Sequence, residues 1–447
     1  MPRFLPVVSG VVLAALLALS FLADWRNLGP NGSIDLRNRV TGVRLLWAEK
    51  DPYHYKWAPG DPEGWWDPHN RPSLPTTWVT VTPPMLLCHQ PVAAVPYPQG
   101  RYLWLGLQWA CLLSILGAGW WMCGKGKAGW LWALAVLVFT CTANWRLHAE
   151  RGQSYVVLAA LLAWWVALTR HPRWGNTFRT GLVAGLLVAF RLPFLMLVPF
   201  VAWKYRRQLG GMAAVLVVAV GLTWLINPSC WNDYSRAMGQ WSETYRSGVN
   251  PPPGLQVAPG KVVEGMDRAQ MGRFSAIPFA DSSLFQLFRG WGWAPLPSWP
   301  FLLVLLVVLG AWLWAARKQE GGVLVLGYAG WCFAADFFLP ALRNTYNDVL
   351  ILALLAPILA AAWPRREKAA KKNVIPRGPT WARAAFWVLA AALFAGWWVL
   401  EAQPRARASI NLPTFGFVII CLLAWLGPLR PPRPAAAPAP APGRKKR

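Results

Sequence analysis

Long apolar segments, separated by polar connections, follow one another along most of the chain. A helix needs about 20 apolar residues to cross the hydrocarbon core of a bilayer, and many of these segments approach that length. We therefore predict an all-α polytopic membrane protein, a bundle of about 12 transmembrane helices. The expected helices lie near residues 4–23, 102–123, 129–143, 154–169, 180–190, 192–203, 212–227, 299–316, 322–339, 347–363, 382–399 and 412–427.

The apolar segment 76–95 does not fit this pattern, because it contains prolines and the polar pair His89-Gln90. Counting it as a span would turn the later basic loops outward. Lys and Arg of short loops are normally retained on the cytoplasmic side. We therefore place residues 76–95 on the outer surface as an interfacial element.

The segment 180–203 contains Arg191-Leu192-Pro193, which predicts two short helices because proline steers the preceding residue out of the helical region. A turn there brings the basic loops 170–179 and 204–208 to the same, cytoplasmic side. Short helices at membrane depth are tolerated where they line a cavity of the protein. We therefore expect Arg191 at the outer mouth of such a cavity.

This threading leaves two long outward loops, 24–101 and 228–298, and long loops in compact proteins usually carry function. Of the 18 carboxylates only Glu320 and Glu367 fall on the cytoplasmic side. We therefore expect a cell (inner) membrane protein whose active face is outward, or periplasmic. Residues 1–427 form one transmembrane domain, and residues 428–447 form a disordered, basic, Pro/Ala-rich cytoplasmic tail.

The first apolar segment, 4–23, is either a cleaved signal peptide or a retained helix. Arg3 precedes it, as in a signal, but the segment is long for one and no tight small-residue cleavage site stands out, so we favour the helix.

The formal charge of +26 is explained by Lys and Arg of loops that are retained on the cytoplasmic side. The 32 Trp residues are explained by the preference of aromatic side chains for the membrane–water interfaces. We predict no nucleic-acid partner. The seven cysteines form no CxxC pair, and neither an HExxH motif nor a His/Cys cluster occurs, so we predict no metal site. Cys88 and Cys230 both lie in outward loops, and whether they pair is open.

The polar stretch that begins at Asp35 has apolar residues at helical spacing and predicts an amphipathic helix on the membrane surface. Asp35 has two interpretations. A carboxylate at a helix start can cap free backbone N–H groups. It also lies just beyond the first membrane helix, facing a lipid-accessible cavity, where it could take part in chemistry.

Four segments spread over residues 33–210 carry motifs that can be compared with a known family. They are "DLRNRVTGVRLLWAEKDPYHY", "VTPPMLLCHQPVAAVP", "ERGQSYVVLAALLAW" and "GLVAGLLVAFRLPFLMLVPFVAWKYRR". They resemble motifs of glycosyltransferase family 87 (DUF2029), a GT-C class group of enzymes that use polyprenyl-phosphate sugars. Asp35 and Asp51-Pro52-Tyr53 match the opening of that family, whereas Leu36 and Arg39 depart from its aromatic positions.

The resemblance implies a metal-independent hexosyltransferase without a cofactor. It would move a sugar, with mannose as one candidate, from a polyprenyl-phosphate donor in the membrane lipid to a glycan or lipid acceptor. Asp35 would be the catalytic base, and Arg191 would stabilise the leaving phosphate. Other residues expected in the site are Arg151, Gln153 and Tyr53 for the donor, and Tyr346, Asn347 and Asp348 as further acid/base or acceptor contacts.

A transporter or lipid-translocating protein is the alternative, and Asp336 near the outer end of its helix is the feature that such a protein could use. Transporters typically show internal repeats and charges in mid-helix. The sequence shows no repeat, so we favour the enzyme.

Overall fold

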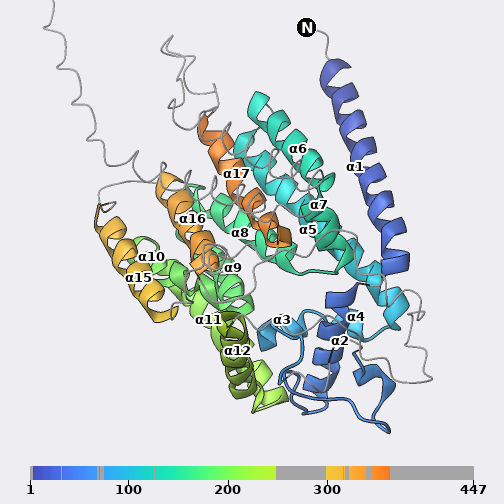
Figure 1. The fold of residues 1–447 in the computed structure, drawn as a ribbon. Helices are drawn as coiled ribbons and strands as arrows, with labels where there is room; N and C mark the ends of the chain where they lie inside the picture. Colours follow the sequence, from blue (N-terminus) through green and yellow to red (C-terminus); the bar gives the residue numbers. More distant parts are fainter. Residues whose placement is uncertain are drawn as a thin grey trace, which may run out of the picture.

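The computed structural model describes residues 4–31, 33–67, 70, 75–124, 126–247, 298–315, 317, 322–338 and 345–362 (Figure 1). Within these ranges all regular elements are helices, which confirms the all-α prediction there. The predicted helices 382–399 and 412–427, the tail 428–447 and most of loop 228–298 lie outside the described residues.

Three described helices are long and apolar enough to cross a membrane: α1 (Phe4–Asn31), α5 (Tyr97–Cys123) and α11 (Arg206–Ile226). A fourth span would be the pair α6 (Lys127–Thr140) and α7 (Ala143–Glu150), which bends by 60° between its two parts. The shorter apolar helices are α8 (Tyr155–Thr169), α9 (Phe178–Phe190), α10 (Leu197–Lys204) with η2 (Leu192–Met196) before it, α16 (Gly322–Phe338), and α17 (Val349–Ala362) with η4 (Thr345–Asp348) before it. The apolar helix α15 (Ser298–Ala315) precedes α16.

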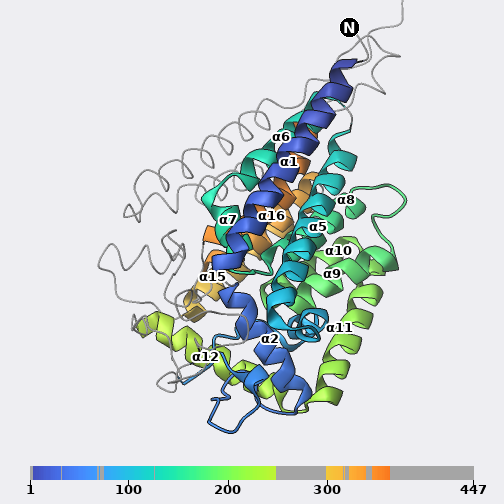
Figure 2. The same ribbon diagram turned by 90° about the vertical axis from the view of Figure 1, so that its right-hand side faces the viewer.

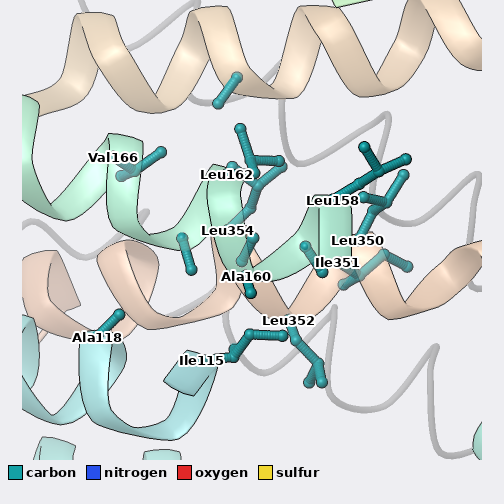
Figure 3. Packing of buried hydrophobic residues seen from close by; sticks show 14 of the residues in the cluster. Ile115, Ala118, Leu158, Ala160, Leu162, Val166, Leu350, Ile351, Leu352 and Leu354 are labelled. Carbon is teal, nitrogen blue, oxygen red and sulfur yellow. The ribbon is translucent and has the colours of Figure 1, made fainter. Parts of the chain in front are cut away.

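The main core lies between α5, α8 and α17. Their apolar side chains point toward one another, and most are fully buried. Figure 3 shows this packing through Ile115 and Ala118 of α5, Leu158, Ala160, Leu162 and Val166 of α8, and Leu350, Ile351, Leu352 and Leu354 of α17.

Helices α9 and α11 run in the same direction and touch through glycines. A Cβ on Gly181 would lie 2.0 Å from the Gln208 carbonyl oxygen, and one on Gly211 would lie 2.1 Å from that of Phe178. Small residues allow the two backbones to approach this closely. Close packing stabilises helix pairs in membranes, because burial of apolar surface contributes little to their association there.

The predicted break at Arg191 is present, because α9 ends at Phe190 and η2 begins at Leu192. The chain returns through α10 before α11 begins, so loops 170–179 and 204–208 meet at one end of the bundle. There Gln208 Nε2 donates to the Gly175 carbonyl oxygen at 2.5 Å, and the Arg207 backbone N–H donates to Asn176 Oδ1 at 3.1 Å. The prediction that these two loops share a side is therefore confirmed.

The opposite end of the bundle carries the smaller elements α2 (Ile34–Trp47), η1 (Glu63–Trp65), α3 (Pro83–Leu87), α4 (Gln90–Ala93) and α12 (Cys230–Ser247). Side chains of α2, α3, α4 and α12, with Trp66 directly after η1, share a second apolar cluster with the start of α5. Figure 2 shows α12 lying obliquely across this end. Residues 76–95 form α3 and α4 instead of one long helix, which agrees with their exclusion from the spans.

Helix α2 differs from the prediction, because its arginines are not solvated or directed to lipid headgroups. Arg37 and Arg39 are only 0% and 5% exposed. Arg37 donates to the Trp66 carbonyl oxygen, and Arg44 donates to the carbonyl oxygens of Gly64 and Ala93. The loop after α2 folds back over the helix, and its free carbonyls need these donors.

Candidate active site

Asp35 lies in the first turn of α2, but its carboxylate does not cap the helix. Arg151 holds it in a two-point ion pair, with Nε to Oδ2 at 2.6 Å and Nη2 to Oδ1 at 2.8 Å. Gln153 Nε2 also donates to Oδ2. The Asp35 side chain keeps 13% of its surface exposed. The carboxylate is therefore oriented by two neighbours and still open to one side.

The turn 151–153, between α7 and α8, supplies both neighbours of Asp35. Its Gly152 has φ +68°, and a Cβ there would lie 2.7 Å from the Leu36 Cβ, so glycine suits both the conformation and the close approach to α2. The Arg151 carbonyl oxygen accepts from the backbone N–H groups of Asp35 at 3.0 Å and Leu36 at 3.2 Å. This carbonyl, which sequence reasoning did not foresee, satisfies N–H groups at the helix start.

Arg39 lies beneath this turn and was not among the predicted site residues. Its Nη1 donates to the Gly152 carbonyl oxygen at 2.9 Å and its Nη2 donates to Gln153 Oε1 at 2.7 Å. Burial lowers the pKa of Arg39, and the nearby Asp35 carboxylate opposes that effect. One feature of the sequence indicated that Arg39 belongs to the site: it is a charged residue at a position where the family that the motifs resemble has an aromatic residue.

His89 packs beside this buried arginine. Its ring stacks on Trp104 with centroids 4.4 Å apart, and Trp104 Nε1 donates to the Gly152 carbonyl oxygen at 3.0 Å. Burial, with a contribution from the Arg39 charge, lowers the pKa of His89 to about 3. His89 is therefore neutral, so the positive charge in this layer belongs to Arg39.

Arg191, in extended conformation between α9 and η2, forms the second part of the site. Its Nε donates to Asp336 Oδ1 at 3.1 Å, and its Nη2 makes a second contact with the same oxygen. Its Nη1 donates to the Tyr155 hydroxyl at 3.0 Å, and the guanidinium lies 4.9 Å from the centre of that ring. The Arg191 side chain is 22% exposed.

Two tyrosines join the Asp35 and Arg191 parts of the site. The rings of Tyr155 and Tyr346 have centroids 5.8 Å apart, and Tyr346 lies within the electrostatic influence of both Asp35 and Arg151. The structure thus brings together Asp35, Arg151, Gln153, Tyr346 and Arg191 at the end of the bundle opposite the basic loops.

The remaining predicted residues lie deeper or further away. Asp348 is 1% exposed and accepts from Asn144 Nδ2 at 3.2 Å, and Asn347 is fully buried. Tyr53 is fully buried in the cluster beneath α12, where its hydroxyl donates to the Val81 carbonyl oxygen at 3.0 Å. Tyr53 is thus packed against α12 and is not brought to Asp35.

The described ranges contain no group of three His, Cys, Asp or Glu side chains arranged to hold a metal ion. Cys88 and Cys230 are both free thiols in the structure.

A model of glycosyltransferase family 87 matches residues 80–329, more than half of the chain. The chain belongs to glycosyltransferase family 87. The matched range of this family 87 chain contains the turn 151–153 and Arg191, whereas Asp35 precedes it and Asp336 and Tyr346 follow it. The predicted family is therefore confirmed, and with it the prediction of a glycosyltransferase.

Two solved structures resemble the family 87 chain at 14% sequence identity, each covering 94% of this chain and 77% of the other. They are ArnT from Cupriavidus metallidurans bound to undecaprenyl phosphate, with a TM-score of 0.43, and the same protein in the apo state, with a TM-score of 0.39. A comparison with curated proteins found no sequence match.

Proposed function

We propose that this family 87 protein transfers a sugar from a polyprenyl-phosphate-linked donor to a hydroxyl of a glycan or lipid acceptor. The observation that carries the proposal is the meeting of Asp35 and Arg191 at one end of the bundle, joined through Tyr155 and Tyr346. A transfer of this kind needs a base for the acceptor and a cation for the leaving phosphate, and the two residues supply them.

The proposed step balances in charge and atoms. The acceptor oxygen forms a bond to the anomeric carbon, while its proton passes to the Asp35 carboxylate. The bond between the anomeric carbon and the phosphate oxygen breaks, and the lipid phosphate leaves with one more negative charge than it carried in the donor. Arg191 stabilises this charge, because a guanidinium fork matches phosphate oxygens.

Two arginines of the site support an anionic donor. The side chains of Arg151 and Arg191 are 15% and 22% exposed, so both guanidinium groups can be reached from outside. A phosphodiester carries about one negative charge, and a guanidinium group matches its oxygens. We assign donor binding to Arg191, with Arg151 and Gln153 close to the transferred sugar.

The membrane orientation is part of the proposal. Basic loops gather at the end of the bundle away from Asp35, and such loops normally stay in the cytoplasm. We therefore place the protein in the inner membrane with the site facing the periplasm. Mannose is the first sugar to test, and we propose that neither a metal nor a cofactor takes part.

The decisive experiment measures transfer from labelled polyprenyl-phosphate sugars, mannose first, by membranes containing wild type, Asp35→Asn or Arg191→Ala. We expect each variant to lower the rate about 100-fold or more, through loss of the base or of phosphate stabilisation. Asp61→Asn is the control, since this carboxylate lies in an exposed loop and accepts from the Ala58 backbone N–H. Undiminished transfer by Asp35→Asn would remove the assignment of the base.

The same membranes test the transporter alternative. Asp336, which suggested it, is paired with Arg191 in the site. Exchange of the lipid-linked sugar across the membrane, without any transfer to an acceptor, would favour translocation over the enzyme.

A further inference from the structure

Arg39 is a buried cation whose hydrogen bonds go to neutral oxygens. It lies one helical turn after Asp35 on α2, is 5% exposed, and in the described part of the chain has no carboxylate within ion-pair distance. Burying a guanidinium without a paired anion costs free energy unless hydrogen bonds and nearby charge compensate. The nearest compensating charge is that of Asp35, reached through Gln153.

The Gln153 side-chain amide can link Arg39 to Asp35 in only one of its two orientations. A carboxamide has an accepting oxygen and a donating NH₂ group, whereas a guanidinium can only donate. Because Arg39 takes the Oε1 atom, the NH₂ group is turned toward the Asp35 carboxylate. Without Arg39 the amide would be free to rotate and present its oxygen to the carboxylate, which would repel it.

The second hydrogen bond of Arg39 holds the turn itself. The Gly152 carbonyl oxygen accepts from Arg39 and from Trp104, which fixes the left-handed conformation of Gly152. The same turn carries the Arg151 side chain that grips Asp35 and the Arg151 carbonyl oxygen that accepts from the Asp35 backbone. Both partners of the Asp35 carboxylate therefore depend on Arg39.

We infer that Arg39 is a positioning residue for Asp35: through Gln153 and the Gly152 turn it orients the carboxylate that accepts the acceptor's proton. This inference rests on the proposed function, in which Asp35 is the base. Arg39 itself is too buried to touch the sugar or the acceptor.

The inference predicts a loss in kcat without a loss in donor binding. Arg39 is too buried to contact the donor, and it reaches Asp35 through the Gln153 amide and the Gly152 carbonyl oxygen. A displaced base slows the chemical step, so kcat falls while the donor KM changes little. A residue that only supported the fold would lower the amount of folded enzyme and leave kcat per folded molecule unchanged.

The experiment measures kcat and the donor KM for purified Arg39→Gln, Arg39→Lys and wild type. We expect Arg39→Gln to lower kcat about 10- to 100-fold with little change in the donor KM. Arg39→Lys can still donate to the Gln153 amide oxygen, so it should recover part of the lost kcat. It also serves as the second variant if Arg39→Gln does not fold.

Arg44→Gln is the matched control. Arg44 lies on the same helix and also donates to backbone carbonyls, those of Gly64 and Ala93, but has no link to Gln153. We expect its kcat and donor KM to stay near those of wild type. An unchanged kcat in Arg39→Gln, or an equal loss of kcat in Arg44→Gln, would overturn the inference.

A double-mutant cycle tests the route through Gln153. If Arg39 acts through that amide, Arg39→Gln combined with Gln153→Ala should lose about as much as the worse single variant. Losses that multiply would overturn the route. Undiminished transfer by Asp35→Asn would instead overturn the proposed function, whereas loss in Asp35→Asn with an unchanged kcat in Arg39→Gln would overturn this inference alone.

Discussion

At the scale of single residues, the site depends on one positive-φ turn that approaches a helix start. Arg151, Gly152 and Gln153 act together: two side chains hold the Asp35 carboxylate, and the glycine lets the turn come close enough to α2. The contact of this turn with the start of α2 decides between the capping and the catalytic interpretation of Asp35. The helix start is satisfied by a backbone carbonyl, which leaves the carboxylate free for other chemistry.

Gly152→Ala should lower the transfer rate up to about 100-fold, because small displacements of a catalytic group can cost that much. The added Cβ would meet Leu36 at 2.7 Å and push the turn away from Asp35. Gly60→Ala is the matched control, since Gly60 also has positive φ, +107°, but nothing within 4 Å of its Cβ position. The measurement is kcat for both variants, and equal losses would show that backbone conformation alone is responsible.

At the scale of elements, helix contacts decide where Arg191 lies. The parallel contact of α9 with α11, through Gly181 and Gly211, forces the chain to return through α10, and the break before η2 falls at the site end. Arg191 is thereby presented by a turn between two short helices. Asp336 and Tyr155 come from two further helices, α16 and α8, so four elements have to pack correctly to build this half of the site.

Gly211→Ala should destabilise the bundle. Its Cβ would lie 2.1 Å from the Phe178 carbonyl oxygen, and overpacking typically costs about 1–3 kcal/mol, or a few degrees in Tm. Gly221→Ala on the same helix has nothing within 4 Å of its Cβ position and should be neutral or slightly stabilising. Thermal unfolding of both variants in detergent measures the difference, and a Tm for Gly211→Ala equal to that of Gly221→Ala would contradict the close packing.

At the scale of the whole molecule, charge is divided between the two ends of the bundle. The basic loops 170–179 and 204–208 lie at one end, where Arg170 also donates to the Pro357 carbonyl oxygen. The acidic residues of the described ranges lie in the other half, on α2 and its following loop, on α12, or near helix ends that meet there. They are Asp24, Asp35, Glu49, Asp51, Asp61, Glu63, Asp67, Glu150, Asp233, Glu243, Asp336 and Asp348.

This charge division predicts how the protein lies in the membrane. Single cysteines at two exposed positions, Glu63→Cys and Arg173→Cys, should react differently with a membrane-impermeant maleimide, in a background in which the seven native cysteines are replaced by Ser or Ala. We expect Glu63→Cys to be labelled in intact cells with a permeable outer membrane, and Arg173→Cys only after the inner membrane is opened. The reverse pattern would turn the proposed active face to the cytoplasm.

Hydrophobic pattern and proline position were sufficient to predict ten of the helices, the break at Arg191 and the shared side of two basic loops. These are local properties: a run of apolar residues needs a membrane or a core, and a proline interrupts a helix wherever it lies. Motif resemblance added the family, and with it Asp35, Arg151 and Gln153 as members of one site.

Tertiary structure alone decided which partners these residues have. Their hydrogen bonds join residues that are 29 to 145 positions apart in the chain. Examples are the bonds of buried Arg37 and Arg39 to backbone carbonyls, that of Arg151 to Asp35, and that of Arg191 to Asp336. Sequence pattern does not predict such pairings, because a charged residue has the same position in a helical pattern whether its side chain contacts water or a carbonyl oxygen. Its partner depends on which distant segment folds against it.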